Sequence, residues 1–95
     1  MSESEEISGL ISEIEMGAEA EELLKHPLII GFFSASEKHF LSEIKQTDLE
    51  QDLKRDDLFR KIQLVDWLKS FLEHHVVSGE MAKQKIEYIN SEEDI

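Results

Sequence analysis

Apolar residues recur every three or four positions through the second half of the chain, which is the period of one face of an α-helix. Charged residues such as Asp57, Arg60 and Lys69 fall between them. The pattern predicts one long amphipathic helix whose apolar face is broad enough to belong to a core. Two neighbouring stripes make up that face: Leu58, Ile62, Val65, Leu72 and Val76, and beside them Leu64, Leu68, Phe71 and His75.

Local signals predict where this helix begins and ends. Thr47 and Glu50 have the spacing of a capping box, in which each side chain accepts a backbone N–H, so we expect the helix to begin just after Thr47. Gly79 predicts an end at Val77, because glycine is favoured just past a helix C-terminus. The helical period then resumes, so a short final helix is expected over residues 80–90.

Pro27 marks the start of a second predicted helix. Proline suits the first turn of a helix, and it pushes the preceding residue, His26, out of the helical conformation. We therefore expect a helix over residues 27–46. Ser34 and Glu37 also have capping-box spacing, so a start at Ser34 is the alternative.

The two ends of the chain carry weaker helical signals. A helical stripe of apolar residues leads from Ile7 to Ile14, but Gly9 and Gly17 each disfavour a helix by about 1 kcal/mol relative to alanine. Three segments are predicted: an acidic N-terminal segment over 1–17 that is a marginal helix or disordered, a helical domain over 18–89 that opens with a short helix, and a disordered acidic tail over 90–95.

The predicted fold class is all-α. No long run alternates apolar with polar residues, and no Asn-Gly or Asp-Gly hairpin turn is present. The helices over 27–46 and 47–77 are expected to form an antiparallel hairpin. Two helices cannot cover apolar faces this wide, so we expect a three- or four-helix bundle, closed either by the terminal segments or by a second copy of the chain.

The formal net charge of −12 is unevenly spread along the chain. Residues 1–24 hold eight glutamates and no Lys or Arg, whereas residues 25–89 hold eleven acidic residues and all ten basic ones. Because binding to phosphates relies on Lys and Arg, direct binding to nucleic acid or to an anionic membrane surface is not expected. The acidic ends are interpreted as solubilising. The alternative function is an acidic inhibitor, or nucleic-acid mimic, that occupies a basic groove of a nucleic-acid-processing enzyme.

Residue types that perform catalysis are not grouped in this sequence. The chain has no cysteine, which excludes disulfides, thiol chemistry and cysteine-based zinc sites. His39 and Glu43 have the i, i+4 spacing of two metal ligands. No third ligand is evident nearby, and the alternative is that His74 or His75 supplies it after folding. Neither a phosphate-binding glycine loop nor a nucleophile elbow is present. We therefore predict that the protein is not an enzyme and uses no cofactor or metal.

The remaining expectation is a non-enzymatic interaction or assembly protein, a homo-oligomer or a binder of another protein, that uses the exposed part of its apolar face. Trp67 lies at the border of that face, and tryptophan is favoured as an interface anchor, although a half-buried structural position is the alternative. The candidate partner-binding residues are Trp67, Phe71, Phe32 and Phe33 for apolar contact, and Glu13 and Glu15 for the acidic alternative.

Two short stretches resemble a group of small helical proteins encoded by phages and prophages. Residues 20–28, AEELLKHPL, match the opening A-x-x-L-L-x-x-P-L, and residues 79–82, GEMA, match the closing G-x-x-A. The similarity spans Ala20 to Ile86 and leaves the acidic N-terminal segment outside. It implies a phage-encoded helical protein of the virion-assembly type, with no catalytic residues to transfer.

The same sequence predicts a cytoplasmic location, which is the host cytoplasm or the virion for a phage protein. The chain opens on Met-Ser-Glu-Ser-Glu-Glu and lacks the basic start and apolar stretch of a secretory signal. Its apolar runs are also far shorter than the ~18 residues of a membrane span.

Overall fold

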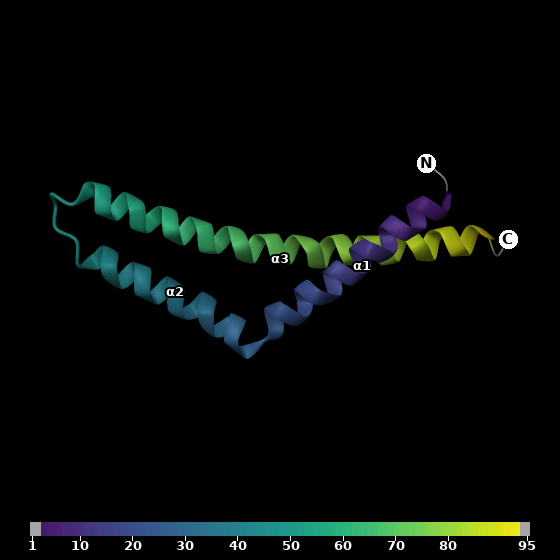
Figure 1. Ribbon diagram of the computed structural model, residues 1–95, viewed down its shortest axis with the longest axis horizontal. Helices are drawn as coiled ribbons and strands as arrows, with labels where there is room; N and C mark the ends of the chain where they lie inside the picture. The colour runs from purple at the N-terminus through teal and green to yellow at the C-terminus, as the bar shows by residue number, and fades with distance from the viewer. Residues whose placement is uncertain (1–2, 94–95) are drawn as a thin grey trace. The chain divides into compact units, whose positions relative to one another are not determined.

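The computed structural model describes residues 3–93 and places them in three helices, α1 (Glu3–Lys25), α2 (Pro27–Lys45) and α3 (Asp52–Glu93) (Figure 1). No strand occurs in this described part, so the predicted all-α class is confirmed. The helices form two units. Unit 1 consists of α1 up to Leu24 and α3 from Phe71 onward, and unit 2 is Lys25–Ser70.

α1 is one continuous helix, where the sequence predicted a marginal or disordered segment followed by a short helix. It begins at Glu3, and its buried residues are Leu10, Gly17 and Ala20. These three lie at 7-3 spacing on one face, the face that packs on α3 within unit 1. Tertiary packing of that face therefore outweighs the low helix propensity of the glycines. Residues 1 and 2 of the predicted segment lie outside the described residues.

The break between α1 and α2 falls at His26, as Pro27 predicts. His26 has an extended conformation (φ −70°, ψ 128°), and its Nδ1 accepts a hydrogen bond of 3.1 Å from the Leu28 N–H. Its carbonyl accepts a second one, of 3.0 Å, from the Ile30 N–H. His26 thus acts as the N-cap of α2, and the alternative start at Ser34 is not the one that occurs.

The predicted start of the third helix at Thr47 is wrong. The Thr47 hydroxyl donates to the Ile44 carbonyl at 2.7 Å and so completes the end of α2 instead. A tight turn connects Thr47 to α3. In this turn the Asp48 N–H donates to Gln51 Oε1 at 2.8 Å, and the Gln51 N–H donates to the Asp48 carbonyl at 3.0 Å. The reciprocal pair is therefore Asp48 with Gln51, and α3 begins at Asp52.

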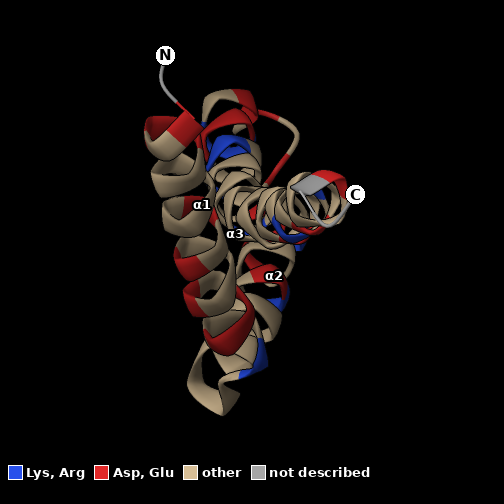
Figure 2. Ribbon diagram, turned by 90° about the vertical axis from the view of Figure 1, so that its right-hand side faces the viewer, with Lys and Arg blue, Asp and Glu red and all other residues tan. Residues whose placement is uncertain are grey.

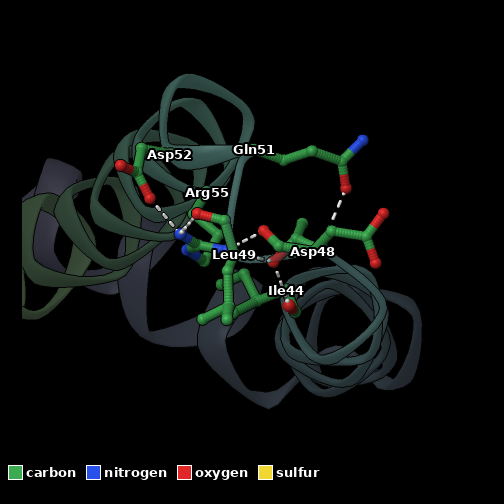
Figure 3. Close-up of polar contacts among 7 residues, drawn as sticks. Ile44, Asp48, Leu49, Gln51, Asp52 and Arg55 are labelled. Atoms are coloured by element: carbon green, nitrogen blue, oxygen red, sulfur yellow. Dashed lines mark hydrogen bonds and ion pairs between the residues drawn. The ribbon is translucent and has the colours of Figure 1, made fainter.

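Arg55, at the start of α3, stabilises the turn between α2 and α3 with its side chain (Figure 3). Its guanidinium donates to Thr47 Oγ1 at 3.1 Å, to the carbonyls of Asp48 and Leu49, and to the carboxylate of Asp52. One planar group thus satisfies acceptors on both sides of the turn, which suits the fork geometry of arginine.

α3 does not end at Val77, and the prediction based on Gly79 is wrong. The helix passes through Gly79 and continues to Glu93, so the predicted final helix is part of it and the tail predicted to be disordered from residue 90 is helical as far as Glu93. Residues 94 and 95 lie outside the described part. Gly79 is inside the helix because α1 approaches its backbone.

The two helices of unit 1 run in opposite directions and touch backbone to backbone at Gly17 and Gly79. A Cβ added at Gly17 would lie 2.8 Å from the His75 carbonyl oxygen and 3.0 Å from Gly79 Cα. Ala20 and Ala82 are buried three residues beyond each glycine. Each helix therefore presents a G-x-x-A motif, and small side chains allow the close contact.

The two helices of unit 2 also run in opposite directions, which agrees with the predicted hairpin (Figure 1). The seam between them consists of half-buried residues around one buried leucine, Leu58. Because each unit contains only a pair of helices, the closing of a three- or four-helix bundle stays a prediction. The seam residues are Ile29, Phe33, Ser36 and Phe40 on α2, and Arg55, Leu58, Ile62 and Val65 on α3.

Candidate protein-interaction surfaces

The seam of unit 2 leaves two outer faces. On each helix the seam residues follow a 4-3 spacing. The residue that precedes a seam residue therefore lies on one flank of the seam, and the residue that follows it lies on the opposite flank. When two such helices run in opposite directions, the flanks formed by the preceding residues come to the same side. The hairpin therefore has a preceding-residue face and a following-residue face, which differ in composition.

The first of these, called here the Leu64 face, is rich in apolar residues. Leu28 and Phe32 precede the seam on α2, and Leu64 precedes it on α3, with Leu68 one turn further on. All four are exposed, Leu28 to 77% and Leu64 to 65%. Monomeric soluble proteins rarely expose large apolar side chains in a contiguous patch, and such a patch marks an interaction site.

The charges on the Leu64 face are of both signs. Lys54, Asp57 and Lys61 all precede seam residues. Asp57 and Lys61 form an ion pair of 3.0 Å between Oδ2 and Nζ, which neutralises one charge with the other. This face therefore combines exposed apolar side chains with a net charge of +1 from Lys54, Asp57 and Lys61.

The opposite face, called here the Phe59 face, is more mixed. Its exposed apolar residues are Ile30, Leu41 and Phe59. The remaining positions that follow the seam residues include three acidic side chains and no Lys or Arg: Ser34, Glu37, Asp56, Gln63 and Asp66. This face is thus apolar in part but carries negative charge only.

The net charge of the protein belongs entirely to unit 1. By sequence, unit 1 has fourteen acidic residues against two basic ones, and unit 2 has eight of each. The acidic positions are conspicuous along α1 in Figure 2. Glu6 pairs with Lys85 at 2.9 Å across unit 1, whereas Glu13, Glu15 and Glu19 are exposed.

The predicted partner-binding residues are distributed over both units. Trp67 and Phe71 are exposed on α3, and the Phe71 ring lies edge-on to His75 with 4.6 Å between centroids. Phe32 is on the Leu64 face, and its ring lies edge-on to the Phe33 ring with 5.7 Å between the ring centroids. Phe33 itself is half-buried in the seam.

Sequence reasoning missed Leu28 and Leu64, two of the most exposed apolar residues of unit 2. Leu64 stood in a stripe that read as core, and Leu28 stood at a helix start. Their distinguishing signal is position, since each comes one residue before a seam residue, Ile29 or Val65. The seam has to be known before this signal can be used.

The one His-Glu pair singled out from the sequence is in side-chain contact, with 3.3 Å between His39 Nε2 and Glu43 Oε1. Among residues 3–93, no group of three or more His, Asp or Glu side chains is arranged to hold a metal ion. An open groove on unit 1 is lined by Glu3, Glu6, Lys85, Tyr88, Ile89 and Glu92, and Glu6 and Lys85 form an ion pair in it. Such a groove differs from the enclosed apolar pockets that bind small molecules.

No protein-family model matches this chain, and no curated protein or solved structure is detectably similar to it. The resemblance to phage assembly proteins therefore stays a prediction. Within the described helices, no stretch is both long and apolar enough to cross a membrane.

Proposed function

We propose that this protein is a non-enzymatic interaction or assembly protein that binds a protein partner through the exposed apolar faces of its helices. The observation that carries this proposal is the exposure of large apolar side chains. Among the described residues, Leu28, Leu64 and Trp67 are exposed to 77%, 65% and 63%. Large apolar side chains that gather on a surface are typical of protein-interaction sites.

The scarcity of core residues supports the same proposal. Only four apolar side chains are buried among the described residues: Leu10, Ala20, Leu58 and Ala82. Two of these are alanines, which contribute little to stability through burial. Hydrophobic burial is the main favourable term in folding, so a chain with this little of it gains stability from a partner that covers its exposed faces.

Site-specific photo-crosslinking in the cells that make the protein tests this proposal. A photoreactive amino acid at Leu64, on the Leu64 face, is expected to yield a covalent adduct with a polypeptide, either another protein or a second copy. The matched control carries the same group at Arg60, which is exposed and lies two residues past the seam residue Leu58. The absence of any polypeptide adduct from Leu64, or equal adducts from both positions, would contradict the proposal.

A second candidate function rests on the charge of unit 1. An acidic helix that exposes Glu13, Glu15 and Glu19 fits a basic groove of a nucleic-acid-processing enzyme. Binding of that kind weakens as salt rises and weakens when the three glutamates are replaced by glutamine. Binding that is insensitive to both would exclude this candidate and leave the apolar one.

A further inference from the structure

We infer that an exposed stripe on α3 of unit 1 binds an amphipathic helix of another protein whose flanks carry Lys or Arg. This inference rests on the proposed function and names the chemistry of the partner. The stripe, called here the outer stripe, consists of His74, Val77, Met81, Gln84 and Tyr88. These residues follow one another at 3-4-3-4 spacing, so they lie in one line along a single helix.

The outer stripe points away from α1. The two helices of unit 1 touch at Gly79, and the buried Ala82 lies on the same side of α3. Val77 and Met81 are each two residues from Gly79, which is about 160° around a helix of 3.6 residues per turn. All five stripe residues are exposed, Val77 to 56% and Met81 and Tyr88 to 64% each. The packing of unit 1 therefore leaves this side of α3 open to another helix.

The outer stripe has the composition of a helix-packing surface. None of its five residues is Asp, Glu, Lys or Arg, in a chain of which 34% is charged. Val77, Met81 and Tyr88 supply apolar area, and methionine and tyrosine are enriched at interfaces. An uncharged line between rows of charged residues is the pattern of a helix that packs lengthwise on another helix.

One flank of the outer stripe is acidic throughout the described part of unit 1. Glu73, Glu80 and Glu87 each precede a stripe residue and recur every seven residues, so they form one row beside the stripe. All three are exposed. Glu80 pairs with Lys83 at 3.3 Å, but an exposed pair of this kind holds its partners weakly. The row therefore offers three carboxylates to cations on a partner.

These charges select a basic helix in preference to a second copy of the chain. Rows that flank a helix-packing stripe decide which partners pair. In an antiparallel second copy the acidic row would meet its own equivalent, which costs free energy. In a parallel second copy it would meet Ser78 and Lys85, and Lys85 is already paired with Glu6 at 2.9 Å. A helix with Lys or Arg on both flanks complements the acidic row in either direction.

Isothermal titration calorimetry on the purified full chain tests the inference with synthetic peptides of about four heptads. The probe has Leu along its packing stripe and Lys on both flanks, and the matched peptide has Glu in place of each Lys. The Lys peptide is expected to bind at least about tenfold more tightly than the Glu peptide. Equal affinity of the two peptides, or no binding of the Lys peptide at about 100 μM, overturns the inference.

A substitution that leaves the charge unchanged locates the binding site. Met81→Gln removes apolar area from the centre of the outer stripe and is expected to raise the dissociation constant of the Lys peptide at least about tenfold. Met16→Gln makes the same change at an exposed methionine of α1 and should stay within about threefold of the wild type. Equal effects of the two substitutions would show that the peptide binds elsewhere and would overturn the inference.

A second set of variants tests the acidic row. Replacing Glu73, Glu80 and Glu87 together by glutamine is expected to weaken binding of the Lys peptide at least about tenfold at an ionic strength of about 0.1 M. The matched control makes the same change in net charge at three exposed glutamates of α1: Glu13, Glu15 and Glu19. An equal loss in both variants means that binding follows total charge, which overturns the inference. All the replaced residues are exposed, and far-UV circular dichroism verifies that the variants keep their helices.

The failure of this inference differs from a failure of the proposed function. If the Lys peptide does not bind but Leu64 still crosslinks to a polypeptide in cells, the proposed function stands and only the basic helix on the outer stripe is disproved. If the peptide does not bind and Leu64 yields no adduct, both are disproved. A wild-type dimer in sedimentation equilibrium that Met81→Gln dissociates would assign the outer stripe to a second copy and would also overturn the inference.

Discussion

His26 shows how a single side chain separates two helices. Its Nδ1 accepts a hydrogen bond from the Leu28 N–H, which lies in the first turn of α2 and so has no acceptor within the helix. Replacing His26 with alanine removes that acceptor, and the free energy of unfolding is expected to fall by about 1 kcal/mol. Chemical denaturation measures the loss. His26→Asn restores a capping acceptor and should recover most of it. An asparagine variant as unstable as the alanine variant would show that the cap contributes little.

Gly17 and Gly9 offer a matched pair of substitutions on the same helix. A Cβ at Gly17 would collide with the His75 carbonyl at 2.8 Å, and neither backbone can yield without moving a whole helix. Gly17→Ala should therefore lower the free energy of unfolding by about 1–3 kcal/mol, in spite of the better helix propensity of alanine. Gly9 has nothing within 4 Å of its added Cβ, so Gly9→Ala should raise it by about 0.5–1 kcal/mol. Opposite signs for the two variants in urea unfolding are the expected result, and equal signs would contradict the close contact.

At the scale of the elements, the turn between α2 and α3 depends on Arg55. Its guanidinium serves acceptors on Thr47, Asp48 and Leu49, so Arg55→Ala should cost about 2 kcal/mol of unfolding free energy. Arg55→Lys keeps the charge but lacks the planar fork, so its free energy of unfolding should lie between those of the wild type and Arg55→Ala. The control is Arg60→Ala on the same helix, at an exposed position, where a change within about 0.5 kcal/mol is expected. Thermal unfolding of all three variants compares the losses.

The helical type of the elements could be predicted from the sequence, but their number and some of their ends could not. The 3.6-residue apolar period and Pro27 correctly indicated helices and the break at His26, because these signals act within a few residues. Gly79 was misread as a stop, because glycine serves equally for a helix end and for close contact with another helix. Only the presence of Gly17 on α1, far away in the sequence, decides between the two. A G-x-x-A motif on both helices is the signal that could have revealed the contact.

The start of α3 was misplaced for a different reason. Thr47 and Asp48 both have an acceptor-bearing residue three positions later, so two overlapping capping boxes were available. Neither box forms in full. The Gln51 side chain accepts the Asp48 N–H, but the Gln51 N–H donates to the Asp48 backbone carbonyl, and the Thr47 hydroxyl donates to the Ile44 carbonyl at the end of α2. Local patterns of equal quality compete at such a turn, and Arg55 donates hydrogen bonds to both Thr47 Oγ1 and the Asp48 carbonyl in the arrangement that forms.

At the scale of the whole molecule, the charge that the sequence places at its ends is collected in one unit. α1 and the part of α3 from Phe71 onward contribute thirteen acidic residues to unit 1, so carboxylates repel one another across it. Raising the NaCl concentration from about 10 mM to about 0.5 M screens this repulsion and should raise Tm by several degrees. Differential scanning calorimetry measures the shift. A variant with Glu13→Gln and Glu19→Gln should show a higher Tm at low salt and a smaller response to salt. A Tm that is independent of salt in the wild type would contradict the repulsion.

The candidate surfaces were predictable only in outline. An apolar face too wide for two helices pointed to a partner, and the structure retains that imbalance between exposed and buried side chains. Which apolar residues are exposed depends on how α2 and α3 meet, since Leu64 and Val65 are adjacent in sequence but differ in role. The seam is set by packing between distant segments, which a single sequence does not display.

The glycine contact of unit 1 also fixes the register of its two helices. A slip of α1 by one turn in either direction would bring Glu13 or Glu21 to the place of Gly17, against the His75 carbonyl. A glutamate side chain at this place would clash with the backbone oxygen, and its negative charge would be repelled by it. The glutamates one turn away from Gly17 therefore disfavour both shifted alignments. The acidic residues of α1 thereby disfavour the shifted alignments of the two helices. A one-turn insertion or deletion in α1 between Glu6 and Gly17 would change the distance between these residues along the helix, so that the Gly17 contact and the Glu6–Lys85 pair could not both be kept.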